Sequence, residues 1–326
     1  MSLLRITSYN VHSCVGSDGH YDVQRVGQTI SATKPDLVAL QEIEVNHVRQ
    51  QTRLWSTVHF DNQPKLLSEA VGLQHCVFAP AIRSVAVGNL SNGKESHNES
   101  DCHGSFGIAI LSRFPILDTK TLNFTQYKRK TLRNALAVLV ETEGVKVWFV
   151  CTHLGCHFGG EQYEQVKEIL PFLHTLAQDL NASGVILAGD TNSPPFFKAI
   201  RHLKRQGMID TWDQVGGRSC STTFPALGWP CCYSWTCCPP LLKLDYIMFR
   251  PSTRAMQPCL ECNATWVVQD GDSEDNGLHN VDLMASDHRP LCATFHVRRL
   301  SDDRVEFQAG GGGMSSPALM SVRMRR

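Results

Sequence analysis

The sequence has no net charge, and therefore no overall electrostatic attraction to a charged partner. Its 326 residues contain 31 Lys and Arg against 31 Asp and Glu. Proteins that coat nucleic acid by bulk electrostatics are usually basic, so this composition argues against that class, although it allows a local basic groove. The charges are unevenly distributed, since residues 298–326 hold six Arg and three acids and leave a charge of −3 for residues 1–297.

No segment of this sequence is predicted to carry the chain to or through a membrane. No apolar run approaches the roughly 18 residues that cross a bilayer. The first ten residues, MSLLRITSYN, have no charged stretch followed by a long apolar one. We therefore expect an intracellular, cytoplasmic protein. In that compartment most of the 13 cysteines should be free thiols.

Length and composition predict a globular protein. Apolar residues make up 42% of the chain, and the length suits one large domain or two ordinary ones. No internal repeat is visible, and after Val297 the composition shifts to Arg, Gly and Ser. We expect a single domain over residues 1–297 and a disordered Arg/Gly-rich tail over residues 298–326.

Short apolar runs alternate with amphipathic stretches along the chain. Helices are predicted over 22–32, 66–73, 161–180 and 196–206, and Pro171 should kink the third or split it in two. The predicted strands are 3–8, 36–40, 76–79, 108–111, 116–122, 135–140, 145–151, 185–188, 244–249, 265–268 and 290–297. Because strands outnumber helices and several are adjacent, the pattern indicates a mixed α/β fold rather than a strict βαβ repeat.

Residues that can bind metal or move protons lie next to the apolar runs. Four runs end directly before such a group: Asn10, Glu42, His153, and Asp190 with Asn192. Two later runs reverse this order and are opened by Asp245 and by Asp287-His288. Strand ends lie at the rims of sheets, where binding and catalytic sites are built.

A shared rim would bring four carboxylates, two Asn and two His together. Four carboxylates cannot share one small site in ionised form unless a cation offsets them. Oxygen and imidazole donors favour Mg²⁺ or Mn²⁺ over zinc. Any one of these residues alone is typical of a turn or a helix cap, so the prediction depends on the ordered set.

The ordered set resembles the endonuclease/exonuclease/phosphatase superfamily, which includes deoxyribonuclease-like enzymes. The matching pieces occur in the family's order: TSYN ending at Asn10, PDLVALQE ending at Glu42, GIAILSRFP from Gly107, THL around His153, GDTN around Asp190, LDYI around Asp245, and SDHRP around His288. The resemblance implies an α/β (α+β) fold, a four-layer sandwich of two mixed β-sheets flanked by helices. It also implies metal-dependent hydrolysis of phosphate esters.

The resemblance assigns the metal and the attacking water to particular residues. Glu42 resembles the principal Mg²⁺ ligand, with Asn10 and Asp287 close to the metal. Asp190 resembles the residue that orients or deprotonates the attacking water, and Asn192 resembles its partner in positioning the phosphate.

Three further residues match the part of the family's site that handles the phosphate. Asp245 and His288 resemble an Asp–His pair in which the carboxylate fixes the imidazole tautomer. His153 resembles the second His, which contacts the phosphate or assists the leaving group. Arg133 stands where the family often has a phosphate-facing Arg, although it also fits a surface Arg in the basic run 128–133.

Two features depart from the family's pattern. Ile108 follows Gly107 where related hydrolases often have a polar residue, which puts a ligand contact from that strand in doubt. Segment 226–240 is longer and richer in Trp and Cys than expected. Its Trp229, Tyr233 and Trp235 are compatible with base stacking, with contact to a lipid interface, or with local packing.

Taken together, these features predict a metal-dependent hydrolase that cleaves phosphate esters. We expect a nuclease-like phosphodiesterase, in which an Asp-activated water attacks in line with assistance from Mg²⁺ (or Mn²⁺) and His. Nucleic acid or a nucleotide is the leading substrate class, and no protein partner is evident. A phospholipid-directed enzyme, acting on sphingomyelin or phosphoinositides, is the second hypothesis. A catalytically silent binding protein is the third, and the complete polar set argues against it.

Overall fold

The structure, a computed structural model, describes ten segments of the chain. These are residues 2–46, 59–83, 104–125, 132–157, 160–179, 182–216, 221–225, 242–252, 260–268 and 284–297. The Trp- and Cys-rich segment 226–240 and the tail 298–326 lie outside them, so the predictions made for both segments stay predictions. Within the described residues, no helix is long and apolar enough to span a membrane.

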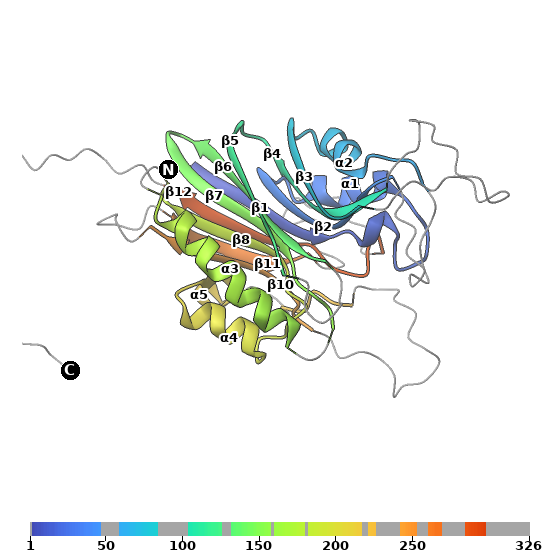
Figure 1. Cartoon of the computed structure of the whole chain (residues 1–326). Coiled ribbons are helices and arrows are strands. Elements are labelled where there is room, and N and C mark those ends of the chain that lie inside the picture. Colours follow the sequence, from blue (N-terminus) through green and yellow to red (C-terminus); the bar gives the residue numbers. More distant parts are fainter. Residues whose placement is uncertain are drawn as a thin grey trace, which may run out of the picture.

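Two six-stranded sheets form the centre of the fold (Figure 1). The first sheet has the strand order β11-β12-β1-β2-β4-β3, and the second has β5-β6-β7-β8-β10-β9. The strands are β1 (Ser2–Asn10), β2 (Leu37–Val45), β3 (His75–Arg83), β4 (Ser105–Ser112), β5 (Ile116–Asn123), β6 (Asn134–Thr142), β7 (Val145–His153), β8 (Gly184–Asp190), β9 (Ile209–Asp210), β10 (Asp245–Pro251), β11 (Leu260–Val267) and β12 (Leu291–Val297).

Helices cover the outer faces of both sheets. They are α1 (Val23–Ala32), α2 (Gln63–Val71), α3 (Glu161–Ala177) and α4 (Lys198–Arg205). The short α5 (Thr211–Val215) instead contacts β10 and β11, which belong to different sheets, and a 3-10 turn lies at η1 (His12–Cys14). Figure 1 shows α1 and α2 on one side of the sandwich and α3 and α4 on the opposite side. The expected four-layer α/β sandwich of two mixed sheets is therefore confirmed.

The three largest apolar clusters among the described residues fill the spaces between these layers. Residues such as Phe149 and Phe295 pack between the two sheets. Trp148, which neighbours Phe149 on β7, points the other way and packs with α3. Tyr9 packs in the third cluster with residues of α1 and α2. Alternate residues thus enter different clusters, because successive side chains of a strand point to opposite faces.

The predicted elements agree with the structure except at two places. Helix α3 continues through Pro171, so of the two expected effects, a kink or a split, the split is wrong. Strand β9 and helix α5, which follow α4 directly, were not predicted. They are two and five residues long, too short for a periodic pattern to emerge.

Strand direction places the polar residues at one rim. Strands β1 and β2 run parallel, as do β7 and β8, and the first pair packs on the second. Strand β12 runs antiparallel to β1, so its first residue, Leu291, pairs with Ser8 near the end of β1. Strand β10 runs antiparallel to β8, so its first residue, Asp245, pairs with Asp190. This is why the polar residue follows the apolar run in the early strands and precedes it in the late ones.

Gly189, the residue before Asp190, lies where the backbones of β7 and β8 approach each other closely. It has φ 154°, and a Cβ there would lie 2.0 Å from the carbonyl oxygen of Thr152 on β7. We expect Gly189→Ala to lower the free energy of unfolding by about 3 kcal/mol, because the backbones must move apart.

Gly19 provides the matched control. It also has positive φ, 80°, but a Cβ there would meet no atom within 4 Å. Gly19→Ala should therefore cost only about 1 kcal/mol of backbone strain. Urea unfolding of both variants measures the difference, and equal losses would contradict the close approach.

Candidate active site

Asp190 lies at the centre of the polar residues that the rim brings together. Its Oδ1 accepts a hydrogen bond from the backbone N–H of Asn192 at 2.8 Å, and its Oδ2 accepts one from Asn10 Nδ2 at 3.0 Å. The Nε2 atoms of His153 and His288 lie 3.5 Å and 3.7 Å from the same Oδ2. Residues from four separate segments of the sequence thus meet at one carboxylate.

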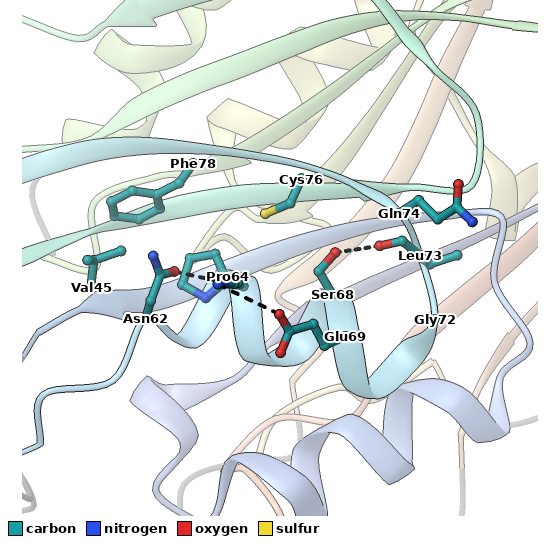
Figure 2. Close-up of a pocket in the computed structure, with 11 residues that line it drawn as sticks. Val45, Asn62, Pro64, Ser68, Glu69, Gly72, Leu73, Gln74, Cys76 and Phe78 are labelled. Carbon is teal, nitrogen blue, oxygen red and sulfur yellow. Dashed lines mark hydrogen bonds and ion pairs between the residues drawn. The ribbon is translucent and has the colours of Figure 1, made fainter.

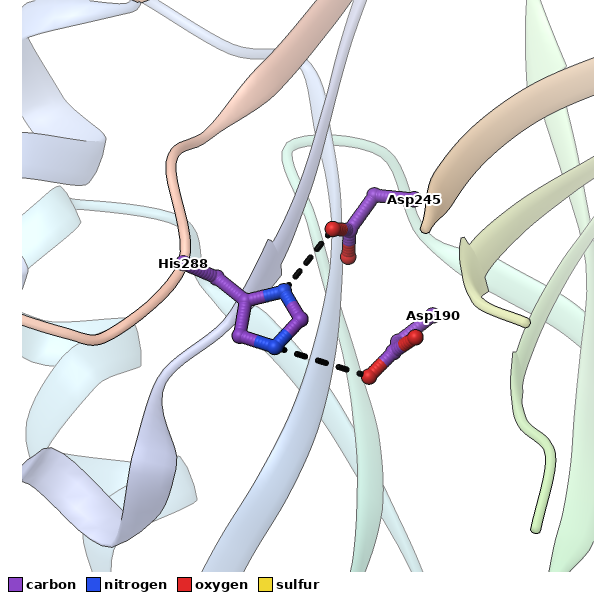
Figure 3. Close-up of side chains that lie close together, drawn as sticks. All are labelled: Asp190, Asp245 and His288. Carbon is purple, nitrogen blue, oxygen red and sulfur yellow. Dashed lines mark hydrogen bonds and ion pairs between the residues drawn. The ribbon is translucent and has the colours of Figure 1, made fainter. Parts of the chain in front are cut away.

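Asp245 and His288 form a hydrogen-bonded pair beside Asp190. The Nδ1 atom of His288 lies 2.8 Å from Asp245 Oδ2, and both side chains are buried. Figure 3 shows the imidazole between two carboxylates, with Nδ1 toward Asp245 and Nε2 toward Asp190. An ionised carboxylate can only accept, so Nδ1 carries the proton in this pair.

Glu42 reaches the site because β2 is irregular at this point. The pairing of β2 with β4 shifts between Gln41 and Ile43, and Glu42 between them has φ 55°. Such a bulge re-aims one side chain relative to its neighbours. The Oε1 atom of Glu42 accepts a hydrogen bond from Asn10 Nδ2 at 3.3 Å and lies 3.9 Å from His153 Nε2. With 19% of its side chain exposed, Glu42 is the most open of the predicted carboxylates that approach Asp190.

Asn10 joins Glu42 to Asp190. Its Oδ1 accepts a hydrogen bond from the backbone N–H of His12 at 3.1 Å, which turns its Nδ2 toward both carboxylates. Asn10 therefore acts as a donor in this arrangement. Its predicted closeness to a metal stays a prediction.

Asn192 connects the centre to Arg133. Asn192 has φ 48°, and its Nδ2 lies 3.1 Å from His153 Nε2 and 3.0 Å from the carbonyl oxygen of Leu154. The Nε atom of Arg133 donates to the same carbonyl at 3.3 Å, and its guanidinium lies over Phe106. Arg133 is buried, so its alternative interpretation as a surface Arg is wrong.

Asp287 approaches the group through Ser286. The Ser286 hydroxyl donates to the backbone oxygen of Asn10 at 2.7 Å and lies 3.3 Å from Asp287 Oδ1. The same hydroxyl accepts from the backbone N–H of His288 at 3.2 Å. Ser286 thereby ties the start of β12 to the end of β1.

Burial and neighbouring charge shift the acid–base properties of the centre. Burial, followed by the charge of Asp245, raises the pKa of Asp190 to about 7. Burial alone would lower the pKa of His288, but the nearby charges of Asp245 and Asp190 outweigh it and raise that pKa. The positive charge of His288 thus favours the ionised form of Asp190, and the negative charge of Asp190 favours the protonated form of His288.

The donor set fits a hard divalent cation. Asp190, Asp245 and His288 each offer a ligand atom, and these atoms lie within 4.8 Å of one another. A cation held by all three would compete with the 2.8 Å hydrogen bond between His288 and Asp245. Glu42 is more exposed than Asp190 and Asp245, and its oxygens are therefore easier for a cation to reach. Carboxylate oxygens are the ligands that Mg²⁺ and Mn²⁺ prefer, and a cation would offset the charge that raises the pKa of Asp190.

The structure also shows what the sequence reasoning missed. The hydroxyls of Ser286 and Thr223 hold site residues but were not predicted to do so. Ser286 lay inside a recognised motif, whereas Thr223 stands next to Thr222 with no periodic pattern to mark it. Ile108 packs between the sheets, as its apolar character suggested, and offers no polar contact.

The described cysteines are not among the predicted site residues, and neither are the residues that line a surface groove. Cys14, Cys76, Cys151, Cys156, Cys262 and Cys292 are free thiols, as expected for most of the cysteines. A groove of about 730 Å³ runs between α2 and β3 (Figure 2). Its lining includes Asn62, Ser68 and Phe78 and none of the predicted site residues.

Sequence comparison extends the motif match to most of the chain. The profile of the Endonuclease/Exonuclease/phosphatase family matches residues 7–288. No curated protein matches the chain by sequence.

Solved structures of low sequence identity share the fold. An endonuclease/exonuclease/phosphatase from Beutenbergia cavernae DSM 12333 is 22% identical with a TM-score of 0.64, and the match covers 91% of this chain and 72% of that one. A humanized D. rerio TDP2 is 20% identical with a TM-score of 0.55, covering 90% and 99%. TDP2 from Caenorhabditis elegans is 15% identical with a TM-score of 0.56, covering 91% and 75%.

Cation binding at this site should depend on pH. Above a pKa of about 7 the Asp190 carboxylate is ionised and a cation offsets its charge, whereas below it the protonated group needs no counter-charge. We expect millimolar Mn²⁺ to raise Tm by about 3–6 °C at pH 8, and the rise to fade as pH drops through 7.

Thermal unfolding of two Glu variants completes this test. Glu42→Gln should remove most of the Mn²⁺-dependent rise, while Glu69→Gln, on the exposed face of α2, should keep it. A rise that is independent of pH, or unchanged in Glu42→Gln, would place the cation elsewhere.

Proposed function

The chain belongs to the Endonuclease/Exonuclease/phosphatase family, and we propose that it is a metal-dependent phosphodiesterase with nuclease-like activity on nucleic acid or nucleotides. Endonucleases, exonucleases and phosphatases all hydrolyse phosphate esters. The convergence of Asn10, Asn192, His153 and His288 on the carboxylate of Asp190 is the observation that carries the proposal. We take residues 1–297 as the catalytic domain.

Glu42 is the proposed principal ligand for Mg²⁺ or Mn²⁺, with Asp287 and Asn10 nearby. When bound, the cation supplies positive charge that offsets the carboxylates and the substrate phosphate. Asn10 Nδ2 contacts both Glu42 and Asp190, so it holds the proposed ligand and the proposed base at a set separation.

Asp190 is the proposed residue that orients the attacking water and accepts its proton. The backbone N–H of Asn192 occupies Oδ1, which leaves Oδ2 facing the other site residues. A base works best when its pKa lies near the working pH, and the pKa of Asp190 is raised to about 7 by its buried surroundings. The position and the acid–base property both suit this role.

His288 is the proposed donor to the phosphate or to the departing oxygen. Asp245 holds Nδ1, so Nε2 is the atom directed toward Asp190 and the reacting groups. The raised pKa of His288 favours its protonated form, which can donate from Nε2. His153 and Asn192, whose side chains contact each other, are the proposed phosphate contacts, with Arg133 joined to Asn192 through the carbonyl oxygen of Leu154.

Hydrolysis of a generic phosphodiester tests this function directly. We expect cleavage of bis(p-nitrophenyl) phosphate in the presence of Mg²⁺ or Mn²⁺, and its loss in excess chelator, because the carboxylate site needs a cation. Release of nitrophenol measures the rate, and restored activity after adding back the metal is the control. Full activity in excess chelator would refute the metal-dependent mechanism.

A parallel assay on single-stranded DNA, RNA and lipid vesicles separates the substrate classes. Faster cleavage of the nucleic acids supports the proposed class. Faster cleavage of phospholipid in vesicles would favour the second hypothesis, a phospholipid-directed enzyme, which keeps the same catalytic residues.

Substitutions at the centre should lower turnover without unfolding the chain. We expect Asp190→Ala and His288→Ala each to reduce kcat by about 100-fold or more, since each removes a proposed acid or base. Circular dichroism checks that both variants are folded.

Two substitutions away from the site serve as matched controls. Asp118→Ala on β5 and His174→Ala on α3 remove the same side-chain types from surface positions, and both should leave kcat unchanged. Near-normal rates in Asp190→Ala and His288→Ala would show that the site assignment is wrong.

A further inference from the structure

The segment 221–225 is hydrogen-bonded to the start of β10 through the buried hydroxyl of Thr223. Thr223 is fully buried, and its Oγ1 accepts hydrogen bonds from the backbone N–H groups of Leu244 at 3.0 Å and Asp245 at 3.1 Å. Backbone hydrogen bonds between Thr223 or Phe224 and Leu242 hold the segment alongside. The proposed catalytic Asp245 is therefore fixed at its own backbone by Thr223.

The same two residues also contact the His288 side of the pair. The backbone oxygen of Thr223 accepts a hydrogen bond from the N–H of Arg289 at 2.8 Å. The ring of Phe224 lies 4.9 Å from the imidazole of His288, centroid to centroid, with the planes tilted by 49°. One short segment thus touches both members of the Asp245–His288 pair.

A second threonine holds the opposite side of the same peptide. Both the backbone N–H and the hydroxyl of Thr191 donate to the carbonyl oxygen of Leu244, each at 2.9 Å. Thr191 follows Asp190 directly. The Leu244–Asp245 peptide is therefore held between Thr191 and Thr223, which sets its place relative to Asp190.

The pair needs this support because its two members come from different sheets. Asp245 begins β10 in the second sheet, while His288 precedes β12 in the first. No strand ladder joins them. Only Oδ2 of Asp245 is hydrogen-bonded to His288, and its Oδ1 is buried with no hydrogen-bond partner in the part of the chain that the structure describes. The orientation of the carboxylate therefore depends on where its backbone is held.

We propose that Thr223 and Phe224 are positioning residues that set the distance and orientation of Asp245 relative to His288. This inference rests on the proposed function in one respect, namely that the pair acts in catalysis. Thr223 acts through the backbone of Asp245, and Phe224 acts through the imidazole face. Because neither acts by binding substrate, their loss should lower kcat and leave KM largely unchanged.

Two substitutions at Thr223 test the role of its hydroxyl. Thr223→Val keeps the shape but removes the acceptor, and we expect kcat on bis(p-nitrophenyl) phosphate to fall about tenfold or more with KM within about twofold. Thr223→Ser restores the hydroxyl and should recover most of the rate.

Thr211→Val is the matched control. Thr211 is also buried, and its hydroxyl also bonds the β10 backbone, donating to the oxygen of Ile247 at 3.0 Å. This variant should lower Tm by an amount similar to Thr223→Val but leave kcat unchanged. If both variants lose kcat equally, the effect of Thr223→Val comes from a general loss of stability, and the proposal is overturned.

A spectroscopic readout follows the pair without using activity. The Nδ1 chemical shift of His288, measured in two-bond proton–nitrogen correlation spectra and assigned with His288→Asn, reports its hydrogen bond to Asp245. We expect Thr223→Val to move this shift toward the value in Asp245→Asn, while Thr223→Ser and Thr211→Val keep the wild-type value. An unchanged shift in Thr223→Val overturns the positioning role, whatever the activity does.

Phe224→Leu provides a second, independent test of the proposal if Thr223→Val fails to fold. Phe224 is half-buried, so its truncation leaves the core intact, and the same change in the Nδ1 shift is expected as the imidazole loses its ring contact. A wild-type shift in Phe224→Leu counts against the proposal. If the wild-type protein cleaves no phosphodiester but the shifts change as expected, the proposed function fails and the positioning role stands.

Discussion

Charge repulsion within a buried corner is the constraint on which the site depends. Antiparallel pairing of β8 with β10 sets Asp190 opposite Asp245, and both carboxylates are almost fully buried. Two such groups cannot both stay ionised without compensation. The imidazole of His288 between them supplies part of it, and a divalent cation near Glu42 would supply more. The raised pKa values of Asp190 and His288 are two consequences of this one arrangement.

The sandwich makes that corner by opposing strand directions rather than by a local motif. Strands β1, β2, β7 and β8 end at the rim, and β10 and β12 begin there. The apolar clusters on both faces of each sheet hold these ends in place, so small irregularities have large effects. The bulge at Glu42 is one example, since a regular strand would present this side chain differently. Positive φ at Glu42 and Asn192 places an uncommon backbone conformation at two of the residues whose side chains converge.

Most elements could be predicted from the sequence because their patterns are long. The amphipathic spacing of α3 extends over 17 residues, and the structure differs from the prediction there only in that the helix does not split at Pro171. Strand β9 and helix α5 were too short to show a period. The candidate site residues could be named because each adjoins an apolar run in a recognised order. Thr223 could not, since its partners Leu244 and Asp245 are about 20 residues away and it contacts them through its hydroxyl and their backbone.

The sequence by itself determined the chemical types at the rim, their order along the chain and the family to which the order belongs. Apolar periodicity also indicated a strand-rich mixed α/β fold, while the layered sandwich was implied by the family resemblance. Only the tertiary structure decided which atoms face each other: that Asn10 presents its amide nitrogen, that Arg133 is buried, and that Asp245 and His288 meet across two sheets. The physical reason is the distance along the chain over which each property is set. Side-chain type and spacing are local properties, whereas distances between charges depend on how two sheets twist and pack, to which residues along the whole chain contribute.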